Sequence, residues 1–480
     1  MSQILESPEA VLTTLDKEGN RNWMYPTPSH GGFWKARAIL GWFLIAFFVA
    51  LPWIEIGGRP AILLDLGSRE FTFFGLVLHP TDTILLMVFL LTVLLSIYLF
   101  TALFGRVWCG WGCPQTVYLE FVYRPIERLI EGKENRRKRR DQGPWTFDKV
   151  WRKGVKYFLF MVISVFLAHT FVAYFASWEN LLTWMQQSPT EAPGYFIFMA
   201  FTSALVLFDF AYFREQMCTI TCPYARFQSV LMDKDSLIVS YDPNRGEPRG
   251  TVRDRKNPPP EVMNLDDGDL TFGDCIDCGA CVRTCPTGID IREGLQMECI
   301  ACTQCIDACD AIMDAIDKPR GLIRYTSENN IDGEETSILR PRLFMYIAIL
   351  LVLVSAMTTI IVTRDAMEAH ISRASGTTYT TTADGDVANR MHLRLRNRTS
   401  EAATFDIATV DADDVRIQMV GDASPELPPG DLFRTEAWFT VPADAMPSGG
   451  MTVEVDLSLD GEPVKRKSVR LLGPNGSNDS

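Results

Sequence analysis

Twelve cysteines are the residues best suited to chemistry in this 480-residue sequence, and all of them fall between Cys109 and Cys309. Eight form two runs, CIDCGACVRTCP from Cys275 and CIACTQCIDACD from Cys299, each with C-x2-C-x2-C-x3-C spacing. This repeated spacing predicts two [4Fe–4S] clusters, because soft thiolates suit iron–sulfur chemistry and each run supplies three ligands to one cluster and the fourth to the other. The expected ligand sets are Cys275, Cys278, Cys281 and Cys309 for the first cluster, and Cys299, Cys302, Cys305 and Cys285 for the second.

Two zinc sites are the alternative for these eight cysteines, but zinc sites rarely repeat this triple spacing. One departure from ordinary dicluster sequences is Asp310, which stands where a proline is expected after the last cysteine. The clustering of the cysteines also differs from their spread in disulfide-rich secreted proteins. It indicates metal binding in a reducing compartment.

The other four cysteines form two C-x3-C-P motifs, WCGWGCPQ with Cys109 and Cys113, and MCTITCPY with Cys218 and Cys222. The two motifs have the same spacing and each follows an apolar segment. We therefore interpret each segment with its motif as one copy of a duplicated unit. Proline disfavours helix at the residue before it and suits the first turn of the next helix, so the second cysteine of each motif should cap a helix. The helix dipole there predicts a lowered thiol pKa. These four candidate catalytic cysteines could bind copper or a further cluster; disulfide cycling within each pair and simple packing are the alternatives.

Few other side chains suggest chemistry. His79 and His169 lie toward the same end of two apolar segments and could bind haem or a metal ion. With no third ligand in view, ordinary hydrogen-bonded histidines are the better interpretation. Asp209 and Arg106 lie near the cysteine pairs and could tune their charge, although anchoring at a membrane interface explains both nearly as well.

Five apolar segments must position these residues, and each has the apolarity of a membrane-spanning helix, which needs about 20 residues. They run over Ala38–Pro52, Thr83–Phe104, Tyr157–Phe175, Tyr195–Phe213 and Leu343–Val362. The hydrophobic fraction of 47% fits a chain that is partly embedded in a membrane and partly soluble.

Lysine and arginine predict the orientation of these spans. The loop between the second and third spans contains ENRRKRR at Glu134–Arg140, whereas the loop SWENLLTWMQQSPTEAPG between the third and fourth contains neither residue type. The basic loop should therefore face the cytoplasm, as should the N-terminus and the eight clustered cysteines, and the C-terminus should lie outside. A basic run between two spans, in a chain of net charge −13, favours topology and lipid contact over nucleic-acid binding.

Composition divides the chain into six predicted parts. Residues 236–270 are rich in proline, glycine and charge, which predicts a linker, and residues 372–475 alternate polar and apolar side chains between turns, which is typical of an immunoglobulin-like β-sandwich. The fold class is thus a multi-domain membrane protein with an α-helical bundle, a bacterial-type dicluster insert and an all-β C-terminal domain. The parts are a cytoplasmic N-terminal segment (1–35), a transmembrane domain with four helices and both C-x3-C-P motifs (36–235), the linker (236–270), a dicluster [4Fe–4S] ferredoxin domain (271–320), a fifth transmembrane helix (340–364) and a periplasmic sandwich (372–475).

Three segments together resemble one known family. They are GRVWCGWGCPQTVYLEF, CPYARFQSVLMDKDSLIVSYDPNRGEPRG and the cassette CIDCGACVRTCPTGIDIREGLQMECIACTQCIDACD. All three closely resemble the CcoG/FixG/RdxA family of cytochrome c oxidase accessory proteins, which are membrane polyferredoxins. The resemblance covers essentially the whole chain. It includes Asp310, the departure from ordinary dicluster sequences.

This resemblance implies a multi-pass protein of the bacterial inner membrane that acts in cbb3-type cytochrome c oxidase assembly and reduces Cu(II) to Cu(I) for the copper centre of that enzyme. The clustered cysteines would then carry electrons from a cytoplasmic donor, and the C-x3-C-P cysteines would bind copper or a further redox centre. Expected partners are membrane lipid, a copper chaperone or transporter, and oxidase subunits or assembly factors, with no nucleic acid. Two alternatives are a relay from quinol to a periplasmic reductase, and a non-catalytic scaffold whose sandwich domain grips oxidase subunits.

The charge bias of the loops leads to a prediction about topology. An alkaline phosphatase reporter fused after Arg373 should be active, because that residue is expected in the periplasm. The same reporter fused within Ser240–Asp269 should be inactive, and a fluorescent protein that folds only in the cytoplasm should show the opposite pattern. Reversed activities in bacterial cells would overturn both the orientation and the compartment of the clusters.

Overall fold

The structure is a computed structural model. It describes residue 14 and residues 20–56, 59–66, 70–78, 82–256, 272–337, 340–399 and 402–474, except 411, 413, 423, 429 and 431. His79 and the second half of the predicted linker lie outside the described residues. The chain divides into two compact units, Met1–Phe74 with Pro80–Ser355, and Gly75–His79 with Ala356–Ser480. All twelve cysteines belong to the first unit.

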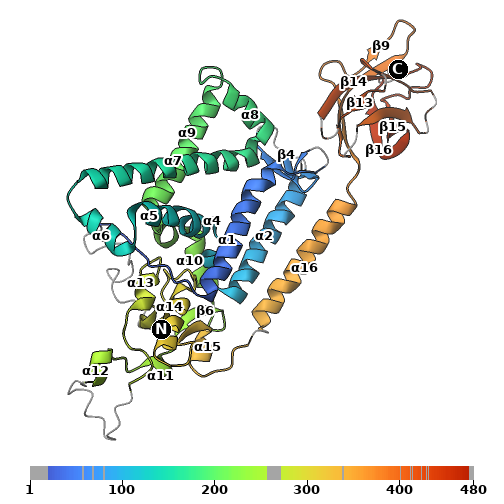
Figure 1. The fold of residues 1–480 in the computed structure, drawn as a ribbon. Helices are drawn as coiled ribbons and strands as arrows, with labels where there is room; N and C mark the ends of the chain where they lie inside the picture. The colour runs from blue at the N-terminus through green and yellow to red at the C-terminus, as the bar shows by residue number, and fades with distance from the viewer. Residues whose placement is uncertain are drawn as a thin grey trace. The chain divides into compact units, whose positions relative to one another are not determined.

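Five helices in the described ranges are long and apolar enough to cross a membrane, as the sequence predicts. Large apolar side chains, among them Ile84, Leu90 and Phe201, stand exposed along them, which suits helices whose outer faces contact lipid. The helices are α1 (Gly32–Ala50, continued by the 3-10 turn Leu51–Trp53), α2 (Thr83–Phe104), α7 (Phe147–Ala176), α9 (Pro193–Phe208, continued by the π-helical turn Asp209–Phe213) and α16 (Pro341–Val362), all visible in Figure 1.

Two of these helices begin more than five residues earlier than predicted. The first, α1, begins six residues before the predicted segment, and α7 begins at Phe147 rather than Tyr157. Thr146 caps α7, because its hydroxyl accepts a hydrogen bond from the Lys149 amide at 3.3 Å. Part of the basic loop is therefore helical, and apolarity alone could not predict this because the lysines of the first turns interrupt it.

Short helices on both sides of the C-x3-C-P motifs connect the spans. After α2 come α3 (Val107–Trp111), α4 (Pro114–Tyr118), a π-helical turn (Leu119–Tyr123), α5 (Arg124–Glu131) and α6 (Glu134–Gln142). After α9 come a π-helical turn (Met217–Thr221) and α10 (Pro223–Leu231).

The dicluster part is built on two short helices, α13 (Ala280–Thr284) and α14 (Gln304–Ala315), and on the antiparallel pair β6 (Ile238–Tyr241) and β7 (Ile323–Thr326). The predicted linker 236–270 is therefore wrong over its first half, which also contains α11 (Pro243–Gly246) and α12 (Val252–Lys256). Val239 and Tyr241 are buried beside the cluster cysteines, and the Arg245 guanidinium forms an ion pair with Asp274 at 2.6 Å. Proline and glycine mark turns of a folded domain here.

Several short elements were not predicted from the sequence. Between α1 and α2 lie the antiparallel pairs β1 (Glu55–Ile56) with β2 (Arg59–Pro60), and β3 (Ile62–Asp65) with β4 (Glu70–Phe73). Helix α8 (Trp178–Gln186) follows α7. The dicluster part also includes a 3-10 turn (Ile291–Glu293) and α15 (Glu328–Ile331), and β5 (Leu76–Leu78) precedes α2.

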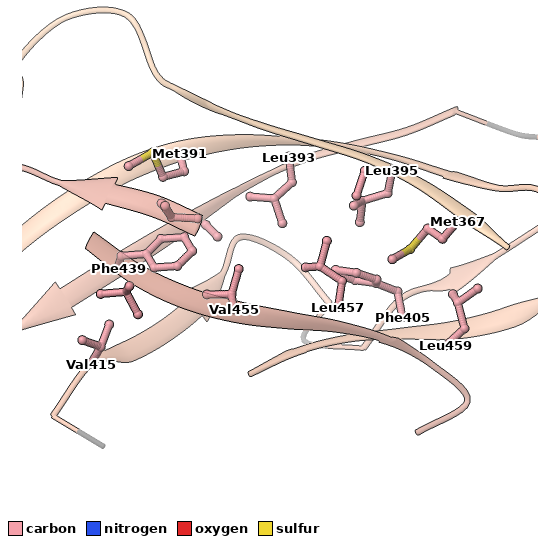
Figure 2. Packing of buried hydrophobic residues seen from close by; sticks show 14 of the residues in the cluster. Met367, Met391, Leu393, Leu395, Phe405, Val415, Phe439, Val455, Leu457 and Leu459 are labelled. Carbon is pink, nitrogen blue, oxygen red and sulfur yellow. The ribbon is translucent and has the colours of Figure 1, made fainter. Parts of the chain in front are cut away.

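The second unit contains the predicted immunoglobulin-like sandwich, with a core shown in Figure 2. One antiparallel sheet has the order β12–β14–β10–β8, with β9 also paired to β10, and the other has the order β13–β11–β15–β16. Leu393 and Phe439 from the first sheet and Phe405 and Leu457 from the second expose none of their surface. The strands are β8 (Met367–Arg373), β9 (Thr380–Thr381), β10 (Val387–Asn397), β11 (Ala403–Thr409), β12 (Arg416–Met419), β13 (Glu426–Leu427), β14 (Leu432–Val441), β15 (Met451–Leu459) and β16 (Glu462–Leu471).

Candidate metal centres

The cysteines of the second predicted set surround one cavity. Its lining contains Cys285, Cys299, Cys302 and Cys305 with mostly apolar neighbours, and it also touches Cys281. The empty volume is about 350 Å³, with the space open to solvent included. Cys285 comes from the end of α13, and the other three come from the loop before α14 and its first turn.

The cysteines of the first predicted set surround another cavity of about 350 Å³. Its lining contains Cys275, Cys278, Cys281 and Cys309. The two helices explain why the fourth cysteine of each run lines the cavity of the other run. Cys281 and Cys285 are four residues apart at α13, and Cys305 and Cys309 are four residues apart on α14. Because residues four apart lie one turn along the same helix face, each helix supplies one cysteine to each cavity.

Both cysteine loops have the same backbone conformation. Two residues after its first cysteine, each loop has a residue with positive φ, Asp277 at 48° and Ala301 at 51°. Two residues later the pattern repeats, with Gly279 at 64° and Thr303 at 61°. Left-handed residues of this kind turn neighbouring amides to one side, as in many anion and iron–sulfur sites. Four cysteines around a cavity beside such amides fit a [4Fe–4S] cluster.

Single metal ions fit these cysteines less well. Among the described residues, which include all twelve cysteines, no three His, Cys, Asp or Glu side chains lie close enough to hold one ion. A cube of four irons is wider than one ion and keeps its ligands farther apart. Four cysteines around each of two separate cavities suit one cluster in each cavity.

The two C-x3-C-P motifs share a backbone conformation of their own. In each, the amide of the second cysteine donates to the carbonyl five residues earlier at 2.8 Å. Four residues before the first cysteine stands a residue with positive φ, Gly105 at 56° and Arg214 at 53°. Cys113 is the N-cap of α4 and Cys222 the N-cap of α10, each followed by a proline. The predicted caps are confirmed, and the repeat extends to the backbone.

Side chains of each motif reach the other half of this repeat. The Gln115 amide donates to the Asp209 carboxylate at 3.1 Å and to the Arg214 carbonyl at 2.9 Å. In the other direction, the Cys109 thiol donates to Oε1 of Gln228 on α10 at 3.1 Å. The four cysteines also lie near one another, because Cys109, Cys113 and Cys222 each raise the pKa of Cys218 electrostatically. The structure thus gathers them where the two halves meet, with Asp209 beside them.

The predicted lowering of the thiol pKa is wrong at Cys113. Burial raises the pKa of Cys109 to about 12, and it also raises the pKa of Cys218 and of Cys113. At Cys113 burial is the largest effect, and the amides of Gln115 and Thr116 at the start of α4 oppose it. The helix terminus acts in the predicted direction, but desolvation of the thiolate outweighs it. Burial likewise raises the pKa of the cluster cysteine Cys302 to about 12, and a bound metal would deprotonate such thiols directly.

The first C-x3-C-P loop packs against the second cysteine loop. Cys109 and Cys302 are both 7% exposed and lie in one apolar cluster with Ile300. A Cβ atom on Gly110 would lie 2.6 Å from the Ile300 carbonyl oxygen and 2.7 Å from Cα of Cys302, so only glycine allows this approach. The Trp111 indole donates to the Tyr325 hydroxyl at 3.0 Å, and that hydroxyl donates to a carbonyl of the same loop at 3.3 Å.

Two arginines reinforce this contact. The Arg37 guanidinium, on α1, is 1% exposed and donates from Nε to the Gly110 carbonyl at 2.9 Å. Its Nη1 and Nη2 atoms have no hydrogen-bond partner in the described part of the chain, and its charge lowers the pKa of Cys302 against the effect of burial. Arg106 is buried and donates to the Met297 carbonyl. Arg37 was not predicted from the sequence, because the predicted first span begins at Ala38. In the structure it lies six residues into α1, and a cation inside a span is itself a signal of function.

His169 forms hydrogen bonds away from the cysteines. In His169, Nδ1 donates to the Val165 carbonyl at 2.8 Å, so Nε2 accepts from the Tyr195 hydroxyl at 3.2 Å. This confirms His169 as an ordinary hydrogen-bonded histidine. His79 lies outside the described residues.

Comparison with known proteins agrees with these observations. Three family profiles match the chain: a 4Fe-4S binding domain over residues 84–136, a 4Fe-4S dicluster domain over residues 213–328, and an Ig-like fold at the C-terminus of FixG over residues 357–474. The first two matches together contain all twelve cysteines.

Curated relatives match over most of their length. Protein RdxA of Cereibacter sphaeroides is 31% identical over 460 residues, which cover 92% of this chain and 94% of RdxA. The nitrogen fixation protein FixG of Rhizobium meliloti is 29% identical over 441 residues, which cover 84% of this chain and 82% of FixG. Among solved structures, a FixG-related protein from Vibrio parahaemolyticus matches with a TM-score of 0.20 and 16% identity, over 22% of this chain and 96% of that chain.

The crossed lining of the two cavities leads to a prediction. Because Cys285 follows α13 in the first run but lines the second cavity, Cys285→Ser should damage the cluster held by Cys299, Cys302 and Cys305. Anaerobic iron analysis and electron paramagnetic resonance should show one cluster lost or altered and the other intact. Cys222→Ser, which removes a thiol outside both cavities, is the matched control and should keep both signals. Selective loss of the Cys275–Cys281 cluster would contradict the crossed assignment.

Proposed function

This chain belongs to the FixG/RdxA family of iron–sulfur membrane proteins, and from that premise we propose that it reduces Cu(II) to Cu(I) at the paired C-x3-C-P cysteines. The product would serve the copper centre of a cbb3-type cytochrome c oxidase during its assembly. The family and its 4Fe-4S domains establish membrane electron transfer. Copper and the oxidase are the additional steps of the proposal.

The contact between the two cysteine loops is the observation that supports it best. Cys109, a proposed copper ligand, lies in one apolar cluster with Ile300 and Cys302, which both line the second cavity. Gly110 brings the two backbones to a distance that no other residue allows. An electron carrier in that cavity would therefore lie beside the proposed copper site, and both would be on one side of the membrane.

Two [4Fe–4S] clusters fit the two cavities, and when bound they supply one-electron carriers. The chain itself supplies their ligands and keeps water away, since apolar side chains such as Ile289, Ile291 and Ile300 complete the lining of the second cavity. Arg37 holds the Gly110 loop in place and puts a buried positive charge near Cys302, where bound thiolates would concentrate negative charge.

The chemistry of the substrate suits these cysteines. A cupric ion takes up one electron, supplied by a cytoplasmic donor, and becomes Cu(I) without any bond to carbon or oxygen being made or broken. Thiolates are soft ligands that favour Cu(I), and two of them are enough to hold it.

A further iron–sulfur cluster at the same cysteines is the second candidate. It is favoured by the match of residues 84–136, which contain Cys109 and Cys113, to a 4Fe-4S binding domain. Iron analysis separates the two proposals, because a third cluster would add four irons per chain while copper reduction requires none at these cysteines. A relay of electrons from quinol would instead oxidise quinol without turning over copper, and a non-catalytic scaffold would do neither.

The cellular setting completes the proposal. The basic loop argues for a cytoplasmic dicluster domain and a periplasmic sandwich in the bacterial inner membrane. Electrons would then enter from a cytoplasmic donor, and copper would arrive from a chaperone or transporter. The sandwich domain would be free to contact oxidase subunits or assembly factors.

The close approach of Gly110 leads to a prediction about electron delivery. Gly110→Ala should push the two loops apart, because the added Cβ meets backbone atoms that cannot rotate away. Cupric reduction should fall by about tenfold or more, since small displacements between reacting centres have effects of this size. Gly154→Ala on α7 is the matched control, because nothing lies within 4 Å of its Cβ. A chromogenic Cu(I) chelator measures the rate, and equal rates in both variants would show that the contact does not matter.

The proposed copper site leads to a prediction about the paired cysteines. A Cys113→Ser, Cys222→Ser double variant should keep both cassette clusters but lose copper binding and cupric reduction, because it removes one thiol from each motif. A Cys278→Ser, Cys302→Ser variant should show the opposite pattern, binding copper without reducing it from a cluster-dependent donor. Equilibrium dialysis with copper and the chelator assay measure the two properties. Copper reduction at the parental rate in the first variant would mean that the paired cysteines are structural.

A further inference from the structure

A large polar cavity in the first unit contains none of the cysteines. It holds about 1380 Å³ of empty space, its open mouth included, and lies between residues 21–25, α5, α6 and the first turns of α7 (Figure 1). Arg214, at the start of the second C-x3-C-P motif, also lines it. Nothing in the proposed reduction of copper uses this cavity.

The lining of this cavity is strongly cationic. Seven lysine and arginine side chains line it against three carboxylates. Glu127 is shared by Arg137 and Arg214, the second at 2.9 Å, and together with Lys156 these cations hold the pKa of Glu127 at about 2 although burial acts in the opposite direction. Glu127 is therefore ionised, and it is already occupied by these cations. Even with Glu215, which pairs with Arg21, four carboxylates face seven cations, so a net positive charge remains.

Three cations in this lining are free to bind an anion. Lys149 donates only to the carbonyls of Asp141 and Gly143, at 3.1 and 2.7 Å, and no carboxylate in the described ranges pairs with it or with the exposed Lys138. Arg21, whose side chain is 8% exposed, pairs through Nη2 with Glu215. Its Nε and Nη1 atoms are buried without a hydrogen-bond partner among the described residues. Buried donors of this kind usually have a partner, so they point to an anionic ligand.

The position of the cavity favours a lipid as the source of that anion. Helix α7 has 30 residues, so it is about 45 Å long, against about 30 Å for the hydrocarbon core of a bilayer. Its first turns, which carry the lysines, therefore extend to the level of the headgroups. Beside them, Leu129, Phe147 and Trp151 are exposed apolar side chains that acyl chains could cover.

We propose that this cavity binds the phosphate of an anionic phospholipid. Lys138, Lys149 and Arg21 would contact the phosphate, and the exposed apolar residues of α5 and α7 would contact the acyl chains. Basic pockets beside transmembrane helices on the cytoplasmic side recognise anionic lipids in this way. The inference does not depend on copper or on the clusters.

The test uses the full-length protein in detergent, freed of native lipid, with bound lipid counted by native mass spectrometry. Dioleoyl phosphatidylglycerol should bind with one tight site, and dioleoyl phosphatidylcholine should bind more weakly. Lys138→Gln with Lys149→Gln should weaken the phosphatidylglycerol site about 25-fold, since each lysine near an anionic lipid surface contributes about fivefold. Lys133→Gln with Arg136→Gln removes the same charge from exposed positions outside the cavity and should change the affinity by about twofold or less.

Equal weakening by the two double variants would overturn the proposal, as would equal binding of the two lipids. Inorganic phosphate is the third probe, and a cavity that binds it but not phosphatidylglycerol would overturn the lipid assignment. A photoactivatable phosphatidylglycerol tests the unmodified protein. Labelling of residues 145–157 supports the proposal, and labelling confined to other segments overturns it.

Discussion

The close approach of Gly110 to the Ile300–Cys302 backbone is the constraint on which the arrangement of the candidate site depends. It joins a membrane-embedded helix bundle to a dicluster domain more than 180 residues later in the sequence. Glycine permits the distance, Trp111 and Tyr325 fix the orientation by hydrogen bonds, and Arg37 holds the loop from α1. Three elements thus converge on one loop, so Cys109 lies in one apolar cluster with Ile300 and Cys302 as a consequence of packing.

Buried charges hold the same region together. Arg124 is 2% exposed and pairs with Glu120 at 2.8 Å and Glu215 at 3.5 Å, and it also donates to the carbonyl of Pro286, next to Cys285. Removing one partner of such a pair leaves an uncompensated buried charge, which costs about 3–5 kcal/mol. Ion pairs of this kind are weak evidence for net stability, but they tolerate only one arrangement of partners. They therefore favour a unique position of the dicluster domain against the helices.

The spacing of residues in the sequence predicted which residues form the site, but it did not predict the environment around them. The crossed sets follow from cysteines four apart on single helices, and the caps at Cys113 and Cys222 follow from the next residue being proline; both patterns are local. The thiol pKa depends instead on tertiary burial, so the dipole argument gave the wrong direction at Cys113. Arg37 and Gly110 matter through partners distant in sequence, and no local pattern showed those partners. The linker error has the same origin, because Val239 and Tyr241 become buried only when β6 pairs with β7.

The duplication of the C-x3-C-P motif has a structural consequence of its own. Each half supplies a cysteine at a helix N-terminus, and the side chains that surround the thiols come from the opposite half, as Gln115 does beside Asp209 and Gln228 beside Cys109. Neither half therefore contains the site. The four thiols come together only when the turns that follow α2 and α9 have packed against each other, and the first half then contacts the second cysteine loop through Cys109. The repeat is symmetric in its backbone, and the first cysteine of each motif, Cys109 and Cys218, joins the apolar cluster that contains Ile300 and Cys302 of the dicluster domain.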